Sequence, residues 1–387
     1  MIPCLRELRW SVRFSLLVLI FGISVHAAWA ETLKIGYIGA LTGDSAMIGN
    51  EIVRSLQTSI AQLNRSGGIN GDKLELVVED DGYVVARSLT AYERLKSVVN
   101  SRVIFMSTYG GLFALGRRPE TDGIVIVDTL DCNDALVKTS TMHTCVATRT
   151  ESIGEAFLER IASQGGGRVG VLYEEEAWFN FIVNTLRSGL KEQLVEVVAP
   201  VSAADYRAEV LKLKASGVQH VVFLGNDSMG RAFDEARRIG IKAPFYSIAS
   251  VTSPGFRRLA GDSLEGTYVS NWLIPRNSEH KKFSEEFKTL HGADITLDFV
   301  VGPTHDAMRL VANALRGSRE PTEIRRALSS QGAFAGISGE IKMDLDGAVR
   351  SIREQLFVLR SGELTPAGNS SRIEADVRAG SRNADRL

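Results

Sequence analysis

Several common features are scarce or missing in this sequence, and each absence narrows what the protein can be. Basic residues do not outnumber acidic ones, with 45 Lys and Arg against 46 Asp and Glu and a net charge of −1. A nucleic-acid or anionic-membrane partner needs clustered positive charge, so neither is expected. After residue 30, no apolar run approaches the roughly 20 residues that a membrane-spanning helix requires.

Metal-binding and nucleotide-binding motifs are also missing. Gly36, Gly39 and Gly43 are spaced G-x-x-G-x-x-x-G, which is neither a dinucleotide fingerprint nor a phosphate-binding loop. The histidines after residue 30 are scattered, and none lies in a spacing typical of zinc ligands. These histidines are His143, His220, His280, His291 and His305.

Two polar stretches look like catalytic or metal sites but have simpler interpretations. Ser228 lies in a G-x-x-S-x-G sequence, one residue off the nucleophile elbow, and we interpret it as a helix N-cap. The acidic run Glu174–Glu176 follows a predicted strand, and we interpret it as a solvated loop. The sequence therefore predicts no enzyme, no cofactor and no metal.

Residues 1–30 have the pattern of a secretory signal peptide. They combine a basic start, an apolar core over residues 15–25 and a small-x-small site at Ala28-Trp29-Ala30. The apolar core is too short to span a bilayer, so cleavage after Ala30 is favoured over a retained anchor. The residue directly after Ala30 is Glu31 and not a cysteine, so a lipid anchor at the cleavage site is not expected.

Only three cysteines are present, and Cys4 lies in the signal segment. Cys132 and Cys145 remain as an even pair in an oxidising compartment, which favours a disulfide between them. The alternative is two buried free thiols.

The stretch Leu33–Asp81 organises the rest of the chain. Residues 34–41 form an apolar run typical of a buried parallel strand, and apolar residues from Ile52 to Leu63 recur at helical spacing. Gly67-Gly68 ends this helix, and residues 74–79 predict a second strand. The stretch is therefore a βαβ unit.

The βα pattern continues and is then repeated, which predicts two doubly wound parallel-sheet lobes. Further strands are expected at residues 103–106, 123–127, 169–173, 195–198, 220–224 and 245–248. Helices are expected at residues 84–99, 112–120, 153–162, 178–190, 206–214 and 228–238. A loop is expected at Tyr109-Gly110-Gly111.

The last part of the chain is expected to return to the first lobe. Residues 268–274 predict a crossover strand, and 279–290 and 299–315 predict helices. Segments 339–344 and 353–359 predict a hairpin around Asp346-Gly347. The expected organisation is a signal peptide (1–30), lobe 1 (31–148 and 275–340), lobe 2 (149–274 and 341–362) and a disordered tail (363–387).

The order of glycines and apolar residues in Leu33–Asp81 resembles the periplasmic binding proteins of the leucine/isoleucine/valine-binding type, and the resemblance continues more weakly to about Leu364. These proteins are the solute receptors of ABC importers. The resemblance implies a type I periplasmic binding fold with a multi-strand hinge. It also implies a monomeric periplasmic protein that closes on a small molecule and delivers it to a membrane permease. The alternative is a ligand-sensing module of a signalling system with the same fold; an enzyme in this fold is the third alternative.

In open α/β sheets, ligands bind outside the carboxyl ends of the strands, and two facing lobes would form a cleft there. The expected cleft loops are residues 42–49, 107–111, 128–132, 174–179, 225–228 and 248–252. From these loops we predict a ligand-binding set of Tyr109, Gly110, Asp128, Leu130, Asp131, Trp178, Asn226, Asp227 and Ser250.

The resemblance also shows where this chain departs from the amino-acid-binding members. Tyr109 stands where they have a small hydroxyl residue, and Ala249 stands where they have the acid that pairs with the ligand ammonium. The disulfide that many of them contain is absent, because Tyr83 and a residue near Thr108 occupy its positions.

Two interpretations of the missing acid remain open. Asp128, Asp131 or Asp227 replaces the acid, or the ligand is not an α-amino acid, because a buried ammonium without a counter-ion is unfavourable. Among an amino acid, an amide and an aromatic compound, we favour a neutral or cationic molecule such as an amide, or an aromatic compound stacked on Trp178 and Tyr109.

Overall fold

The computed structural model describes residues 32–272, 277–352 and 354–368. The predicted signal peptide and residues 369–387 of the predicted tail lie outside the described residues. No helix in the described part of the chain is long and apolar enough to cross a membrane.

The first lobe is built on a five-stranded parallel sheet with the order β2-β1-β3-β4-β5. Its strands are β1 (Thr32–Gly39), β2 (Lys73–Asp80), β3 (Val103–Met106), β4 (Val125–Asp128) and β5 (His143–Cys145). Strands β3 and β4 are buried on both faces, as their uninterrupted apolar runs predict.

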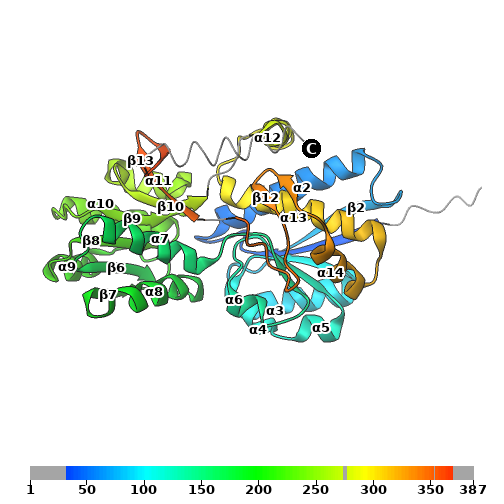
Figure 1. The fold of residues 1–387 in the computed structure, drawn as a ribbon, viewed down its shortest axis with the longest axis horizontal. Helices are drawn as coiled ribbons and strands as arrows, with labels where there is room; N and C mark the ends of the chain where they lie inside the picture. Colours follow the sequence, from blue (N-terminus) through cyan, green and yellow to red (C-terminus); the bar gives the residue numbers. More distant parts are fainter. Residues whose placement is uncertain (1–31, 273–276, 353, 369–387) are drawn as a thin grey trace, which may run out of the picture.

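The second lobe is built on a seven-stranded sheet with the order β14-β13-β10-β9-β8-β6-β7. Its strands are β6 (Val169–Glu174), β7 (Leu194–Ala199), β8 (His220–Leu224), β9 (Phe245–Ile248), β10 (Tyr268–Trp272), β13 (Glu354–Arg360) and β14 (Glu363–Pro366). The five strands from β6 to β10 are parallel and repeat the order of the first sheet, and β13 and β14 add antiparallel edge strands. The predicted two-lobed, doubly wound fold is confirmed (Figure 1).

Helices cover both faces of each sheet. In the first lobe they are α2 (Ala46–Arg65), α3 (Val85–Arg94), the π-helical η1 (Leu95–Val99), α4 (Tyr109–Leu115), α5 (Arg118–Asp122), α6 (Asp134–Val137), α12 (Ser278–His291), α13 (Asp298–Gly317) and α14 (Pro321–Ser330). In the second lobe they are α7 (Thr150–Ser163), α8 (Ala177–Leu190), η2 (Lys191–Gln193), α9 (Arg207–Ala215), η3 (Asp227–Met229), α10 (Gly230–Arg238), η4 (Ala249–Thr252), α11 (Pro254–Ala260) and η5 (Gly261–Leu264).

Each sheet is the middle layer of a three-layer lobe. In the first lobe, α2, α13 and α14 pack on one face of the sheet, and α3 and α4 pack on the other. In the second lobe, α7 and α8 cover one face, and α9, α10 and α11 cover the other. Successive residues of a strand point to opposite faces, so Phe105 packs into one core of the first lobe and Ile104 into the other.

The chain passes between the lobes after β5, after β10 and before β13 (Figure 1). The late crossings explain two wrong predictions. Strands β12 (Gly339–Ile341) and β13 do not form a hairpin; β12 pairs with β11 (Phe334–Gly336), and β13 pairs with β10 and β14. Residues 363–366 form β14 and are not disordered.

Residues 341–352 pack on the first lobe, although the prediction placed them in the second. Ile341, Met343 and Val349 are part of the first lobe's core, and Ala348 forms a bridge with Cys145 of β5. The local turn at Asp346-Gly347 is present, because Gly347 N donates to Asp344 O at 3.0 Å. The Asp346-Gly347 pair therefore predicted the turn correctly, but it did not predict which strands pair with each other.

Candidate ligand-binding cavity

A cavity lies where the carboxyl ends of the two sheets face each other. It encloses about 900 Å³ of space, including its opening to solvent. The first lobe contributes Ala40, Ser45, Ile48, Gly49, Tyr83, Ser107, Tyr109, Leu112, Asp128, Leu130 and Phe299. The second lobe and the crossing segments contribute Thr148, Ile153, Glu176, Trp178, Phe179, Asn226, Ile248, Ala249, Ser250, Ser270, Asn271, Trp272 and Glu354.

All of the loops predicted to border the cleft contribute to this wall. Their place follows from the sheet order, because loops at the switch points between β1 and β3 and between β6 and β8 diverge and leave a crevice. Gly49 shows how closely the first turn of α2 packs on the end of β1, since a Cβ at this position would lie 2.0 Å from Ala40 O.

Most of the predicted ligand-binding residues line the cavity. The wall includes Tyr109, Asp128, Leu130, Trp178, Asn226 and Ser250. Tyr109 and Gly110 open helix α4 instead of forming the predicted loop, which places the Tyr109 ring, 4% exposed, against the cavity.

Three predicted ligand-binding residues, Gly110, Asp131 and Asp227, lie outside this wall. A Cβ on Gly110 would meet Val85. Asp131 is fully buried, and its Oδ1 accepts from Thr150 N at 2.9 Å. Asp227 accepts a hydrogen bond from the Ser253 hydroxyl. These two carboxyls hold local structure behind the cavity.

Trp178 packs against hydrophobic clusters of both lobes and also lines the cavity. Its indole Nε1 donates to Thr150 Oγ1 at 2.8 Å, and its ring lies 5.2 Å from that of Phe179. The ring is therefore held in one orientation at the boundary of the two lobes, beside the cavity.

Asp128 is a buried acid at the end of β4, 1% exposed. Its Oδ1 accepts from Leu130 N at 2.8 Å and from Asp131 N at 3.3 Å, while Oδ2 has no hydrogen-bond partner. His143 Nε2 lies 4.0 Å from Oδ2, but burial lowers the pKa of His143 to about 4, so this ring is neutral at pH 7. Burial and the neighbouring Asp131 raise the pKa of Asp128 well above its ordinary value.

The run Glu174–Glu176 is not a solvated loop, so that interpretation is wrong for two of its three members. Glu174 is fully buried and Glu176 lines the cavity, while Glu175 is exposed. Burial, together with Glu174 and Asp44, raises the pKa of Glu176 to about 8. Its Oε1 accepts from Asn226 Nδ2 at 3.4 Å. Acids that follow a strand can therefore be buried within their own lobe, as Glu174 is, or line a cavity, as Glu176 does.

The interpretation of Ser228 as a helix N-cap is also wrong. Its hydroxyl bonds to the Glu174 carboxylate at 2.6 Å and to Asp44 Oδ2 at 2.9 Å, and it caps no helix. Because Asp44 belongs to the first lobe, Ser228 connects the lobes. Asn226 Nδ2 does the same with Ser45 Oγ at 3.0 Å.

Aromatic side chains also join the lobes. Phe181 of α8 stacks on Phe113 of α4 with ring centroids 5.9 Å apart, and it meets Tyr109 edge-on at 5.6 Å. With the polar contacts of Ser228 and Asn226, these rings hold the two lobes in a closed arrangement over the cavity.

Several lining residues were not predicted because they come from the crossing segments. Glu354 follows one crossing, and its two carboxylate oxygens accept from Thr148 Oγ1 at 2.6 Å and Ser270 Oγ at 2.8 Å. Burial raises the pKa of the Glu354 carboxyl to about 7. Thr148, Ser270 and Trp272 could have been predicted from the expected lobe boundaries, because segments that join two lobes border the cleft between them.

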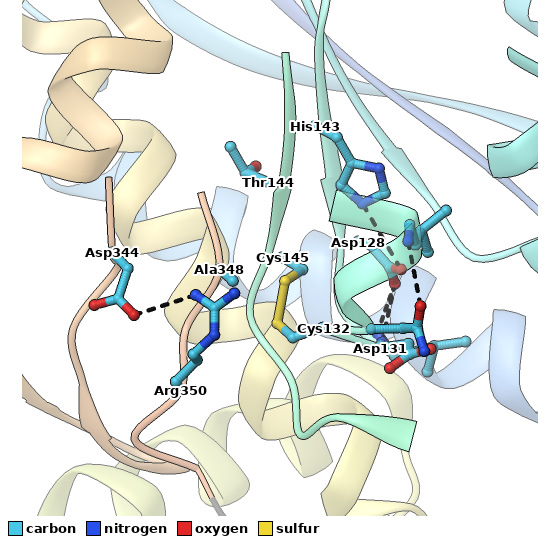
Figure 2. Close-up of a disulfide and its surroundings, with 12 residues drawn as sticks. Asp128, Asp131, Cys132, His143, Thr144, Cys145, Asp344, Ala348 and Arg350 are labelled. Carbon is cyan, nitrogen blue, oxygen red and sulfur yellow. Dashed lines mark hydrogen bonds and ion pairs between the residues drawn. A yellow bond between two sulfur atoms is a disulfide. The ribbon is translucent and has the colours of Figure 1, made fainter. Parts of the chain in front are cut away.

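The Cys132–Cys145 disulfide predicted from the sequence is present, with an S–S distance of 2.14 Å. Cys132 directly follows Asp131, and the bond lies beside Asp128 and Asp131 (Figure 2). On its other side, Cys145 bridges Ala348 and donates its N–H to Gly347 O at 2.8 Å. The bond thus joins one wall of the cavity to the segment that leads into β13.

Glu176 should make the stability of the protein depend on pH. Its pKa of about 8 lies above the ordinary value of 4.5, so the native carboxyl retains a proton that the unfolded chain has lost. The stability from this group is full below about pH 4.5 and is lost as pH rises through 8. Its facing charges and titratable groups are Glu174, Asp44 and Tyr83.

We expect Glu176→Gln to gain stability relative to the wild type between pH 5 and 9, on the order of 2 kcal/mol, because each pKa unit corresponds to about 1.4 kcal/mol and the carboxyl keeps partial solvent access. Chemical denaturation across this range measures the difference. Glu175→Gln, which removes an exposed charge one residue away, is the control and should show a flat difference. A flat difference for Glu176→Gln would contradict the assigned pKa.

No group of His, Cys, Asp and Glu side chains among the described residues could hold a metal ion. Two facing α/β lobes, closed over a cavity lined from both sides, define a solute-binding protein. The chain matches the periplasmic binding protein family over residues 32–360, and it therefore belongs to that family. The members are substrate-binding proteins of ABC transporters and not enzymes.

Curated relatives cover most of the chain. A Leu/Ile/Val-binding protein homolog 2 of Brucella abortus is 24% identical over 343 residues, covering 86% of this chain and 91% of that protein. The Leu/Ile/Val-binding protein of Escherichia coli K12 is 23% identical over 351 residues, covering 86% of this chain and 92% of that protein.

Solved structures share the fold. The branched-chain amino acid transporter substrate-binding protein LivJ from Streptococcus pneumoniae, in complex with isoleucine, superposes with a TM-score of 0.77 at 19% identity, covering 86% of this chain and 98% of LivJ. A solute-binding protein from R. palustris in complex with benzoate also has a TM-score of 0.77, at 16% identity, covering 87% of this chain and 96% of that protein.

Proposed function

We propose that this protein is the periplasmic receptor of an ABC importer and captures a small polar organic solute between its lobes. The observation that carries the proposal is the cavity whose wall comes from both lobes and from the segments that join them. Export would use the signal peptide of residues 1–30, with cleavage after Ala30. The receptor would act as a monomer and deliver its ligand to a membrane permease.

Capture would proceed by hinge closure. One lobe binds the solute first, rotation about the crossing segments brings the second lobe over it, and the closed form is stabilised by the ligand and by the contacts between lobes. The bonds from Ser228 to Asp44 and from Asn226 to Ser45 are available only in the closed arrangement, so they favour it once water has left the cleft. We assign residues 32–148 and 277–352 to one moving body and residues 149–272 and 354–366 to the other.

The relatives bind branched-chain amino acids or benzoate, as their names and complexes state. Here the wall combines the rings of Trp178 and Tyr109 with the carboxyls of Asp128 and Glu176. This combination favours a neutral or cationic molecule with an apolar body over a free amino acid.

The direct test is a thermal-shift screen of the protein purified from periplasm, using amino acids, amides, amines and aromatic acids. A compound that binds only the folded state raises the melting temperature, by an amount that grows with its concentration. We expect one chemical class to raise it, with no chemical change in the compound after incubation. Conversion of the compound to a product would contradict a receptor function.

Leucine at millimolar concentration should leave the melting temperature unchanged. Ala249 provides no counter-ion at the position where amino-acid-binding relatives have an acid, and the ligand carboxylate would be buried near Asp128, at a cost of several kcal/mol. The Leu/Ile/Val-binding protein of Escherichia coli, assayed in parallel, is the positive control. A leucine shift as large as that of the control would show that this cavity accepts an α-amino acid.

A further inference from the structure

The described part of the cavity wall contains acidic side chains and no basic ones. Three carboxyl residues line it, Asp128, Glu176 and Glu354, and no Lys, Arg or His among residues 32–272, 277–352 and 354–368 does so. The Glu354 oxygens are both engaged by hydroxyl groups of Thr148 and Ser270. Asp128 and Glu176 are therefore the acids available to a ligand.

Asp128 and Glu176 approach the same region from different lobes. Asp128 ends β4 of the first lobe, and Glu176 follows β6 of the second. Both carboxyl residues line the same cavity, as does Tyr83. Closure of the lobes thus brings two acids together in a site that water leaves.

Asp128 carries an unpartnered acceptor. Its Oδ2 is buried without a hydrogen bond, and the nearest ring nitrogen, 4.0 Å away, belongs to the neutral His143. A buried acceptor without a partner is unfavourable, so an N–H donor on the ligand would satisfy it. A carboxylate on the ligand would add repulsion at the same place.

Besides hydroxyl and amide groups such as Ser107 and Asn271, the wall contains several aromatic rings. Trp178, Phe179 and Tyr109 lie on the lobe boundary, and Trp272 and Phe299 meet edge-on with centroids 5.8 Å apart near the crossing segments. Such a surface suits an apolar body of a few carbons or one ring, and aromatic faces also attract cations.

We propose that the ligand of this receptor is an organic cation with N–H donors, such as a protonated amine or amidine, that carries an apolar body and no carboxylate, with Asp128 and Glu176 as its counter-ions. The proposal rests on the solute-binding function proposed above and specifies its substrate class. Each lobe supplies one acid, so a bound cation favours the ionised form of both carboxyls and draws the lobes together.

Two sets of compounds test the proposal; within each set the apolar group is similar and the head group is cationic, neutral or anionic. The aromatic set is benzylamine, benzamide and benzoate, and the aliphatic set is isopentylamine, isovaleramide and isovalerate. Dissociation constants are measured by calorimetry on the full mature protein at pH 8. We expect at least one amine to bind about 10- to 100-fold more tightly than its matched amide, because the amide cannot form the charge-assisted hydrogen bonds that the amine forms with the carboxylates. The matched anion should bind more weakly still.

Variants then test whether Asp128 and Glu176 are the counter-ions of the bound cation. Asp128→Asn and Glu176→Gln should each remove most of the preference for the amine over the amide, whereas Glu175→Gln, an exposed charge beside Glu176, should leave it unchanged. Circular dichroism and melting of each variant establish that it is folded. A preference that persists in both folded cavity variants would overturn the assignment.

The outcomes also separate this inference from the proposed function. If an anion or an amide binds as tightly as its amine, or if neither amine binds at millimolar concentration while another compound raises the melting temperature, the cation proposal is wrong and the receptor function stands. If no compound of the two sets or of the wider screen binds, both are contradicted.

Discussion

Replacing Glu174 by alanine is expected to lower the free energy of unfolding of the second lobe by about 3–5 kcal/mol, because the change leaves several buried donors without an acceptor. The Glu174 carboxylate is fully buried and accepts four hydrogen bonds. The donors are Tyr206 OH at 2.8 Å, Ser228 Oγ at 2.6 Å, Asn226 N at 3.1 Å and Ser202 N at 3.2 Å.

Glu174→Ala should also weaken ligand binding, because Glu174 holds Ser228 and Asn226, which form the polar contacts with the first lobe. Urea denaturation measures the stability, and calorimetry with a ligand from the screen measures the affinity. Glu175→Ala is the matched control, since its side chain is exposed and its loss should change stability by less than about 0.5 kcal/mol. Equal stability of the Glu174 and Glu175 variants would refute the buried network.

Removal of the Cys132–Cys145 disulfide should have the second largest effect. The two cysteines are 13 residues apart in sequence, and closing a loop of this size stabilises a protein by about 3 kcal/mol in the chain-entropy model. The double variant Cys132→Ala, Cys145→Ala is the appropriate change, because both side chains are fully buried and alanine adds no polar group. Its melting temperature in the absence of ligand should fall well below that of the wild type.

The disulfide prediction has two controls. Reduction of the wild-type protein should lower its melting temperature towards that of the double variant, and reduction should leave the variant unchanged. Thiol titration of the denatured, unreduced wild type should find no free thiol. Two free thiols, or an unchanged melting temperature in the double variant, would contradict the account of this bond.

The sequence predicted the sheet strands well because their signal is local. A buried parallel strand such as β3 is an apolar run between breakers, and the helix over α2 follows from the spacing of Ile52, Leu56 and Ile60. The position of the cavity followed from a general rule on strand ends, and every loop that this rule selected contributes to the wall.

The errors arose where the identity of a neighbour decides the structure. Glu174 was interpreted as part of a solvated loop because its buried donors Tyr206 and Ser228 are distant in sequence, and Glu176 because the sequence does not show the cavity that it lines. Ser228 was interpreted as a helix cap because Asp44 is distant in sequence. Strand β13 was predicted correctly as a strand, yet its partners are β10 and β14, since pairing depends on contacts between distant segments. Thr148 and Glu354 were missed for the same reason.

Asp131 and Asp227 show the limit of predicting a site from residue type. Both are acids in cleft loops, and both were predicted to bind ligand, but each is turned away from the cavity by a local partner, Thr150 or Ser253. Asp128, only three residues from Asp131, lies in the cavity wall, although each of the two carboxyls keeps one oxygen without a hydrogen-bond partner. The difference depends on side-chain direction, which sequence spacing alone does not fix in an irregular loop.

Small-angle X-ray scattering of the mature protein, with and without a saturating amount of a compound that raises its melting temperature, tests closure of the lobes most directly. The account predicts a smaller radius of gyration with the compound, and a scattering curve in its presence that the closed arrangement described here reproduces. It also predicts that Ser228→Ala, which removes a bond to Asp44, weakens the compaction at equal ligand concentration. Identical curves with and without a bound compound would contradict the claim that the protein traps its ligand by closing two lobes over it.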